Sequence, residues 1–203
     1  MEACESVWVR QPETQRGNWK EIFGNDNPIH LEIGCGKGKF ISEMALKHPD
    51  INYIAMDLFE DVLVLAMEKA FSQSAGNVKF FVGNAAKLEE YFSFGEIERI
   101  YLNFSDPWKK RKQAKRRLTH KNFLNIYKKI IKNGDKICFK TDNKSLFEFS
   151  LNSFAEENYK MSNITLDLHN SDFEDNVMTE YETKFSEMGM PIYRLEATYI
   201  GWE

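Results

Sequence analysis

The sequence of 203 residues lacks the features of membrane, secreted and zinc-binding proteins. No apolar run approaches the roughly 20 residues that cross a bilayer, and the first residues lack the basic-then-apolar pattern of a secretion signal. Three cysteines (Cys4, Cys35 and Cys138) lie far apart without any CxxC pair, which argues against disulfides and structural zinc. We therefore expect a cytoplasmic protein that binds neither membrane nor metal.

The chain also lacks repeats, low-complexity tracts and linkers rich in proline, glycine or serine. Hydrophobic residues make up 42% and charged residues 29%, the balance of an ordinary globular protein with a sizeable core. A single domain over residues 1–203 is the simplest prediction, and both a monomer and a homodimer remain open.

Positive charge is scarce outside one segment. Seven of the nine residues 109–117 are basic, which leaves 20 basic against 31 acidic residues elsewhere. An acidic body with one concentrated basic segment is typical of local phosphate contact. A solvated charged surface is the alternative, because charge runs often serve only solubility.

Short apolar runs alternate with helical patterns along the chain. The pattern predicts strands at 29–33, 53–57, 78–82, 97–104 and 136–141, with further strands near 160–168 and 192–200. It predicts helices near 39–47, 61–71, 85–91, 119–132 (with Thr119 as its N-cap), 146–156 and 178–188. This alternation predicts an α/β fold with a mostly parallel seven-stranded sheet and helices on both faces.

Ligands of such sheets bind beyond the carboxyl ends of the strands. The first of these ends carries LEIGCGKGKF, residues 31–40, whose glycines allow a ligand close to the backbone. A dinucleotide site would need G-x-G-x-x-G, but Lys39 stands where its last glycine would be. Glu32, two residues before Gly34, favours a cationic ligand over a pyrophosphate.

The next two strand ends carry Asp57 and Asn84. An acid in the place of Asp57 can accept the two ribose hydroxyls of an adenosine, although it could also cap the next helix. The amide of Asn84 could contact the adenine edge, but taken alone a helix cap is the better interpretation.

The fourth strand leads into YLNFSDPWKKRKQAKRRL, residues 101–118. With LEIGCGKGKF, FKTDN at 139–143 and MTEYETKF at 178–185, this segment resembles the bacterial tRNA (guanine-N7)-methyltransferases of the TrmB family. The resemblance runs from about residue 19 to residue 199. It implies a Rossmann-like class I fold, S-adenosylmethionine (SAM) as cofactor, tRNA as partner, and methylation of guanine 46 in the variable loop.

The resemblance also implies roles for particular residues. The matching cofactor positions are Glu32, Gly34, Gly36, Asp57, Asn84 and Asp106, with Asp106 also at the catalytic position. The matching substrate positions are Lys110, Asp142, Thr179, Glu180, Tyr181 and Glu182. The matching RNA-binding positions are Lys112, Lys115, Arg116 and Arg117.

The chemistry of N7 agrees with these residue types. Guanine N7 carries a lone pair and no proton, so the reaction needs no general base, and the four isolated histidines show no catalytic or metal-ligand spacing. A carboxylate such as Asp106 could stabilise the cationic product. Asp142 and Glu182 could accept the N–H donors of the guanine edge, and Trp108 or Tyr181 could stack on the base unless they are ordinary core aromatics.

Three alternatives remain. An amino-methyltransferase would carry an Asn/Asp-Pro-Pro-aromatic loop, which Ser105–Trp108 is not. An NAD(P) dehydrogenase is disfavoured by the glycine spacing. A non-catalytic RNA-binding protein with the same fold is disfavoured by the acids at 32, 57, 106 and 142.

Overall fold

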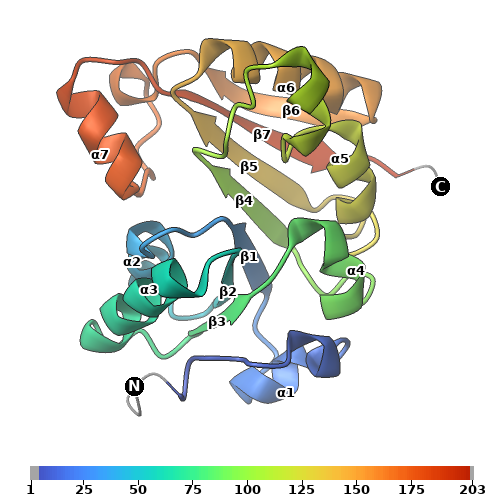
Figure 1. Cartoon of the computed structure of the whole chain (residues 1–203), viewed down its shortest axis with the longest axis vertical. Coiled ribbons are helices and arrows are strands. Elements are labelled where there is room, and N and C mark those ends of the chain that lie inside the picture. The colour runs from blue at the N-terminus through green and yellow to red at the C-terminus, as the bar shows by residue number, and fades with distance from the viewer. Residues whose placement is uncertain (1–4, 202–203) are drawn as a thin grey trace.

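Seven strands form one sheet in the order β3-β2-β1-β4-β5-β7-β6, as seen in the computed structural model, which describes residues 5–201 (Figure 1). Strands β1 to β5 are parallel, whereas β7 is antiparallel to both of its neighbours. The strands are β1 Ile29–Ile33, β2 Asn52–Asp57, β3 Val78–Val82, β4 Arg99–Asn103, β5 Lys136–Thr141, β6 Tyr159–Thr165 and β7 Tyr193–Tyr199. The predicted α/β fold and mostly parallel seven-stranded sheet are confirmed.

Helices cover both faces of the sheet (Figure 1). One apolar core packs α2 and α3 against the β1–β3 half, and the other packs α4, α5 and α6 against the opposite face. The helices are α1 Trp19–Phe23, α2 Lys39–Lys47, α3 Glu60–Ser72, α4 Leu88–Tyr91, α5 Lys121–Tyr127, α6 Lys144–Glu156 and α7 Glu180–Glu187. Short 3-10 helices are η2 Pro12–Gln15, η3 Ala85–Lys87, η4 Arg111–Arg116 and η5 Leu168–Asn170.

The central strands are buried on both faces, as expected for parallel strands between helix layers. Every residue of β1 is buried, including the polar His30 and Glu32. The ring of His30 bonds the hydroxyl of Tyr101 through Nδ1 at 3.2 Å. Polar side chains buried this deeply need such partners, so an unpartnered polar atom in this layer is of interest where it also borders a cavity.

The predicted helix over 119–132 is wrong in its bounds. It begins at Lys121, with His120 as its N-cap, and the side chain of His120 accepts from the amide of Asn122 at 3.2 Å. Thr119 is instead fully buried, and its hydroxyl bonds that of Ser150 in α6 at 2.7 Å. Thr119 therefore contacts α6, and His120 supplies the cap of α5 in its place.

Both edges of the sheet carry irregular structure. The amides of Val9 and Phe80 bond the carbonyls of Phe80 and Val7, each at 2.8 Å, so the N-terminal segment lies along the outer edge of β3. At the opposite edge, the register of β6 against β7 shifts between Ser162 and Thr165.

Within residues 5–201, no helix is both long and apolar enough to cross a membrane. In the same range, no three His, Cys, Asp or Glu side chains gather as ligands for a metal ion. Cys35 and Cys138 are free thiols, while Cys4 lies outside the described residues.

Candidate active site

A cavity of about 410 Å³ opens at the carboxyl ends of the strands. Its floor comes from the end of β1 and the glycine turn, through Glu32, Gly34 and Gly36. Asn103 and Phe104 contribute from the end of β4. The start of α7 forms one wall, through Thr179, Glu180, Tyr181 and Lys184.

Glu32 has one free carboxylate oxygen at this cavity. Its side chain is 2% exposed; Oε1 accepts from Nδ2 of Asn103 at 2.9 Å, and Oε2 has no hydrogen-bond partner within the described chain. Burial raises the pKa of Glu32 to about 8, against the opposing effects of the Asn103 bond and the Lys140 charge. A buried carboxylate in this state is stabilised by a cation or donor that reaches Oε2.

The glycine turn supplies space and close packing at different positions. A side chain at Gly36 would meet nothing within 4 Å, so this glycine borders open space. Gly38 has a φ of 75° and a Cβ there would come within 2.6 Å of the Cβ of Ala66 in α3. Gly38 therefore lets α2 and α3 approach each other, while Gly36 leaves the cavity open.

Asp57 is tied to the glycine turn. Its Oδ2 accepts from the amide of Gly36 at 3.1 Å, and Oδ1 accepts from the amide of Phe59 at 3.2 Å. The N-cap of α3 is Phe59 rather than Asp57, so the alternative of a helix cap is wrong. Asp57 does not line the cavity itself.

Asn84 has the capping role that its alternative interpretation predicted. Its Oδ1 accepts from the amide of Ala86 at 2.9 Å at the start of η3. The side chain is exposed and lies outside the cavity lining.

The loop Ser105–Trp108 follows β4 with an unusual backbone. Phe104 and Trp108 have φ angles of 52° and 42°, in the left-handed region that non-glycine residues rarely adopt. Asp106 is exposed at the tip of this loop. The hydroxyl of Ser105 is buried without a hydrogen-bond partner in residues 5–201.

The wall formed by α7 starts with a well-capped turn. Thr179 is the N-cap, and its Oγ1 accepts from the amide of Glu182 at 2.9 Å. Glu180 pairs with Lys69 of α3, and Lys39 of α2 donates to the carbonyl of Met178 at 2.9 Å. Tyr181 is 62% exposed and stacks on Phe185, with ring centroids 6.2 Å apart, so it is not a core aromatic.

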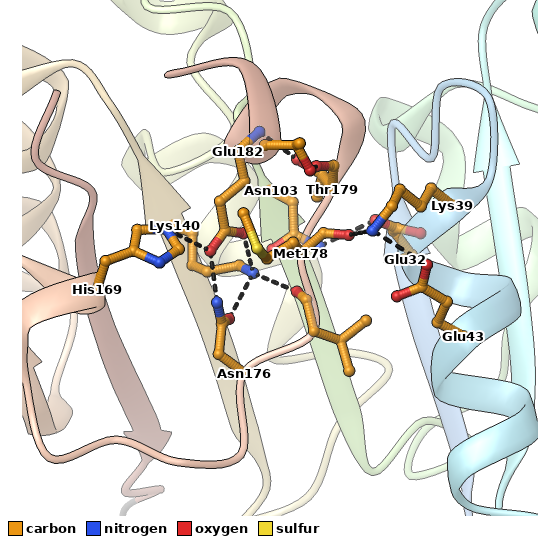
Figure 2. A network of polar contacts seen from close by, with 12 residues as sticks. Glu32, Lys39, Glu43, Asn103, Lys140, His169, Asn176, Met178, Thr179 and Glu182 are labelled. Atoms are coloured by element: carbon orange, nitrogen blue, oxygen red, sulfur yellow. Dashed lines mark hydrogen bonds and ion pairs between the residues drawn. The ribbon is translucent and has the colours of Figure 1, made fainter. Parts of the chain in front are cut away.

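Glu182 lies in a buried polar network beside the cavity (Figure 2). Its Oε2 accepts from the ammonium of Lys140 at 2.7 Å, and its Oε1 lies 3.3 Å from Nε2 of His169 and accepts from Asn176. Lys140 also donates to the carbonyl of Val177 at 2.9 Å. Both oxygens of Glu182 are thus occupied by the protein, and it does not line the cavity.

The other predicted substrate and RNA-binding residues do not line the cavity. Lys110, Lys112 and Lys115 are exposed on and beside η4, and Asp142 is half-buried after β5. Six predicted residues therefore line the cavity together: Glu32, Gly34, Gly36, Thr179, Glu180 and Tyr181. Six other predicted cofactor and substrate residues are not part of its lining: Asp57, Asn84, Asp106, Lys110, Asp142 and Glu182.

Sequence reasoning missed the partners of Glu182. His169 was expected to be isolated, and Lys140 was simply a residue of the predicted strand 136–141. The one available signal is that Lys140 directly follows the apolar run Ile137–Phe139 inside the predicted strand, KICFKT. A lysine buried on a strand requires a buried acid, but the sequence does not show which acid.

All three comparisons with known proteins match methyltransferases. The family model described as "Putative methyltransferase" matches residues 26–195. The tRNA (guanine-N(7)-)-methyltransferase of Listeria monocytogenes serotype 4b (strain F2365) is 52% identical over 199 residues, covering 98% of this chain and 93% of that one. The protein of the same name from Bacillus cytotoxicus is 53% identical over 191 residues, covering 94% and 88%. Among solved structures, the 16S rRNA methyltransferase KamB has a TM-score of 0.67 at 13% identity, covering 91% and 94%.

The strand order with its antiparallel β7 and the cavity at the glycine turn define the class: this is the fold of class I SAM-dependent methyltransferases. The low identity to KamB makes that comparison evidence for the fold alone. At the level of sequence, the chain belongs to the family of tRNA (guanine-N7)-methyltransferases, TrmB.

Proposed function

We propose that the protein transfers a methyl group from SAM to N7 of guanine 46 in the variable loop of tRNA. The observation that carries the cofactor assignment is the free Oε2 of buried Glu32 at the cavity. The substrate assignment is supported by relatives above 50% identity that are named for guanine N7 of tRNA. A tRNA substrate also agrees with the expected cytoplasmic location.

The cavity residues fit SAM. The ammonium of its amino acid part would meet Oε2 of Glu32, and the glycine turn at Gly34 and Gly36 leaves the backbone accessible. Asp57 would accept the ribose hydroxyls, because a carboxylate has about four lone-pair sites and only two are used. Asn84 would contact the adenine edge.

When bound, SAM supplies a methyl group activated by a sulfonium centre. The protein's part is alignment, since an in-line displacement gains much of its rate from orientation. The N7 lone pair would form the new bond to the methyl carbon as the carbon–sulfur bond breaks and S-adenosylhomocysteine leaves as a neutral thioether. No proton leaves, and the positive charge would pass to the imidazole ring of the guanine. Asp106 would stabilise that charge as the catalytic residue.

The predicted substrate residues and the basic residues of η4 would bind the RNA. Lys110, Asp142 and Thr179–Tyr181 would position the guanine, with Tyr181 exposed for stacking. Glu182 would act on the substrate through its neighbours, because its carboxylate is enclosed. Exposed Lys112 and Lys115, with Arg116, would neutralise phosphates.

The test is a methyl-transfer assay with purified protein, labelled SAM and unmodified tRNA, followed by nucleoside analysis. We expect label in 7-methylguanosine, lost when guanine 46 is replaced. Label in another nucleoside would overturn the substrate assignment and keep the cofactor. Absence of label with measurable SAM binding would favour a protein that only binds RNA.

A further inference from the structure

Arg117 is the last basic residue of the segment 109–117, and its side chain turns toward the protein. Nε donates to the carbonyl of Pro107 at 2.9 Å, and Nη2 donates to the carbonyl of Trp108 at 3.2 Å. One guanidinium therefore holds two successive carbonyls of the loop that carries Asp106. This two-pronged geometry is one that a lysine cannot reproduce.

The other side of the guanidinium rests on an aromatic ring. Its central carbon lies 4.4 Å from the ring centroid of Phe149 in α6. The helix α6 begins directly after Asp142, at an N-cap where Asn143 accepts from the amide of Leu146 at 2.9 Å. Arg117 thus connects the loop of Asp106 to the helix that follows Asp142 in the chain.

The loop needs such a support. Trp108 has a φ of 42°, a strained backbone conformation that persists only where the surroundings enforce it. Its carbonyl is one of the two that Arg117 binds, and Arg116 lies over its ring at 4.9 Å.

We propose that Arg117 is a positioning residue that fixes the loop Ser105–Trp108 for methyl transfer, rather than a phosphate ligand. The proposal rests on the proposed function and revises the RNA-binding role predicted for this residue. Exposed Lys115, two residues earlier in η4, keeps the phosphate role. The two residues should therefore fail in different ways when they are replaced.

Kinetics separate the two roles. In Arg117→Lys the charge stays, so phosphate contact survives, but the paired bonds to the loop are lost. We expect kcat to fall on the order of 10- to 100-fold, the scale of a small misplacement of reacting groups, with the salt dependence of tRNA binding unchanged. In the comparison variant Lys115→Gln we expect the loss to fall on KM for tRNA rather than on kcat, with a salt slope lower by about one.

A substitution in α6 that changes no charge tests the contact between Arg117 and Phe149. Phe149→Leu removes the ring under the guanidinium without changing any charge, and we expect a several-fold loss of kcat with an unchanged salt slope. Thermal unfolding and SAM affinity verify that the variant is folded. Wild-type kcat in Arg117→Lys, or a lowered salt slope with kcat intact in an Arg117→Gln variant, would overturn the proposal.

A measurement without substrate makes the inference independent of the assay. With fluorotryptophan incorporated, the 19F resonance of Trp108 is identified by its loss in Trp108→Phe. We expect that resonance to shift or broaden in Arg117→Lys and to stay unchanged in Lys115→Gln. An unchanged resonance in Arg117→Lys would contradict the proposal that Arg117 fixes the loop Ser105–Trp108. If the wild type methylates no tRNA, the proposed function fails, and this comparison still decides the role of Arg117.

Discussion

Glu32 lies where the chain offers its carboxyl group a single donor, Asn103, and leaves the second oxygen free beside the cavity. Burial raises its pKa to about 8 from 4.5. The proton on Glu32 therefore stabilises the ligand-free fold below pH 4.5, and that contribution is lost as the pH rises through 8. A cationic ligand at Oε2 would replace the proton, so the site is ready for SAM at the expense of ligand-free stability.

Glu32→Gln tests whether the buried carboxyl group lowers ligand-free stability while favouring SAM binding. We expect the variant to gain free energy of unfolding relative to the wild type between pH 5 and pH 8.5, because glutamine does not ionise. Its SAM affinity should fall by about 10-fold or more, the scale of a lost hydrogen bond to a charged group. Urea unfolding at three pH values and calorimetric SAM titration measure the two effects.

The control for Glu32→Gln is Glu43→Gln on α2, where the carboxylate is about 39% exposed and pairs with Lys39. Solvent reaches that group, so its stability difference should stay flat over the same pH range. A flat profile for Glu32→Gln would show that Glu32 is ionised without cost in the ligand-free protein.

Asp106 differs from Glu32 because it lies in the open, at the tip of the loop after β4. If it stabilises the cationic guanine, Asp106→Asn and Asp106→Ala should each lower kcat by about 10²-fold or more. SAM affinity should change less than kcat. Turnover close to wild type in both variants would remove Asp106 from the mechanism.

Sequence reasoning could predict acids and glycines of the candidate site where they lie at or just beyond the end of a strand. Glu32 and the turn at Gly34 and Gly36 needed only local pattern and did reach the cavity. Glu182 could not be placed that way, since its partner Lys140 is 42 residues distant. Pairing across the fold depends on how α7 packs, and no local spacing encodes it.

At the scale of elements, α7 and the segment before it are attached to the rest of the fold through lysines. Lys47 pairs with Asp175, Lys39 bonds the carbonyl of Met178, Lys69 pairs with Glu180 and Lys140 pairs with Glu182. These lysines come from α2, α3 and β5, so polar contacts with separate elements hold one wall of the cavity. Figure 2 shows the contacts of Lys39 and Lys140.

Lys140→Met tests the most buried of these contacts. Glu182 would stay enclosed without its cation, which typically costs about 3–5 kcal/mol of unfolding free energy. The double variant Lys140→Met with Glu182→Leu should recover much of this loss. Urea unfolding of the four proteins of this cycle gives the coupling between the two residues.

Lys136→Met on the same strand is the matched control. Lys136 pairs with Glu196 at 3.2 Å but is 38% exposed, so its loss should cost at most about 1 kcal/mol. Equal losses at positions 136 and 140 would mean that burial of the Lys140 pair has no energetic consequence.

The approximate positions of the five parallel strands along the chain were predictable, because buried parallel strands are short apolar runs between polar turns. The end of α5 was not. Ile130 and Ile131 are buried and continue its apolar pattern, but their amides bond the carbonyl of Tyr127 in a tightened turn. A turn that still buries its side chains has the same apolar spacing as a helix.

The charge distribution of the whole molecule predicts a strong dependence on salt. Lys112→Gln together with Lys115→Gln should lower the slope of tRNA affinity against salt by roughly two, at about 0.7–0.9 per phosphate contact. Affinity for SAM should be unchanged, since neither side chain lines the cavity. Filter binding between 50 and 200 mM salt gives the slope, and an unchanged slope would favour a solvated surface for η4.

The outer strands of the sheet bear on how copies of this protein behave when crowded together. An unprotected strand edge is a template on which another chain can add a strand. Residues 7–9 occupy the edge of β3, and the shifted register of β6 interrupts the regular row of backbone groups at the other end. Strand addition is therefore hindered at both ends of the sheet, which disfavours aggregation through the backbone.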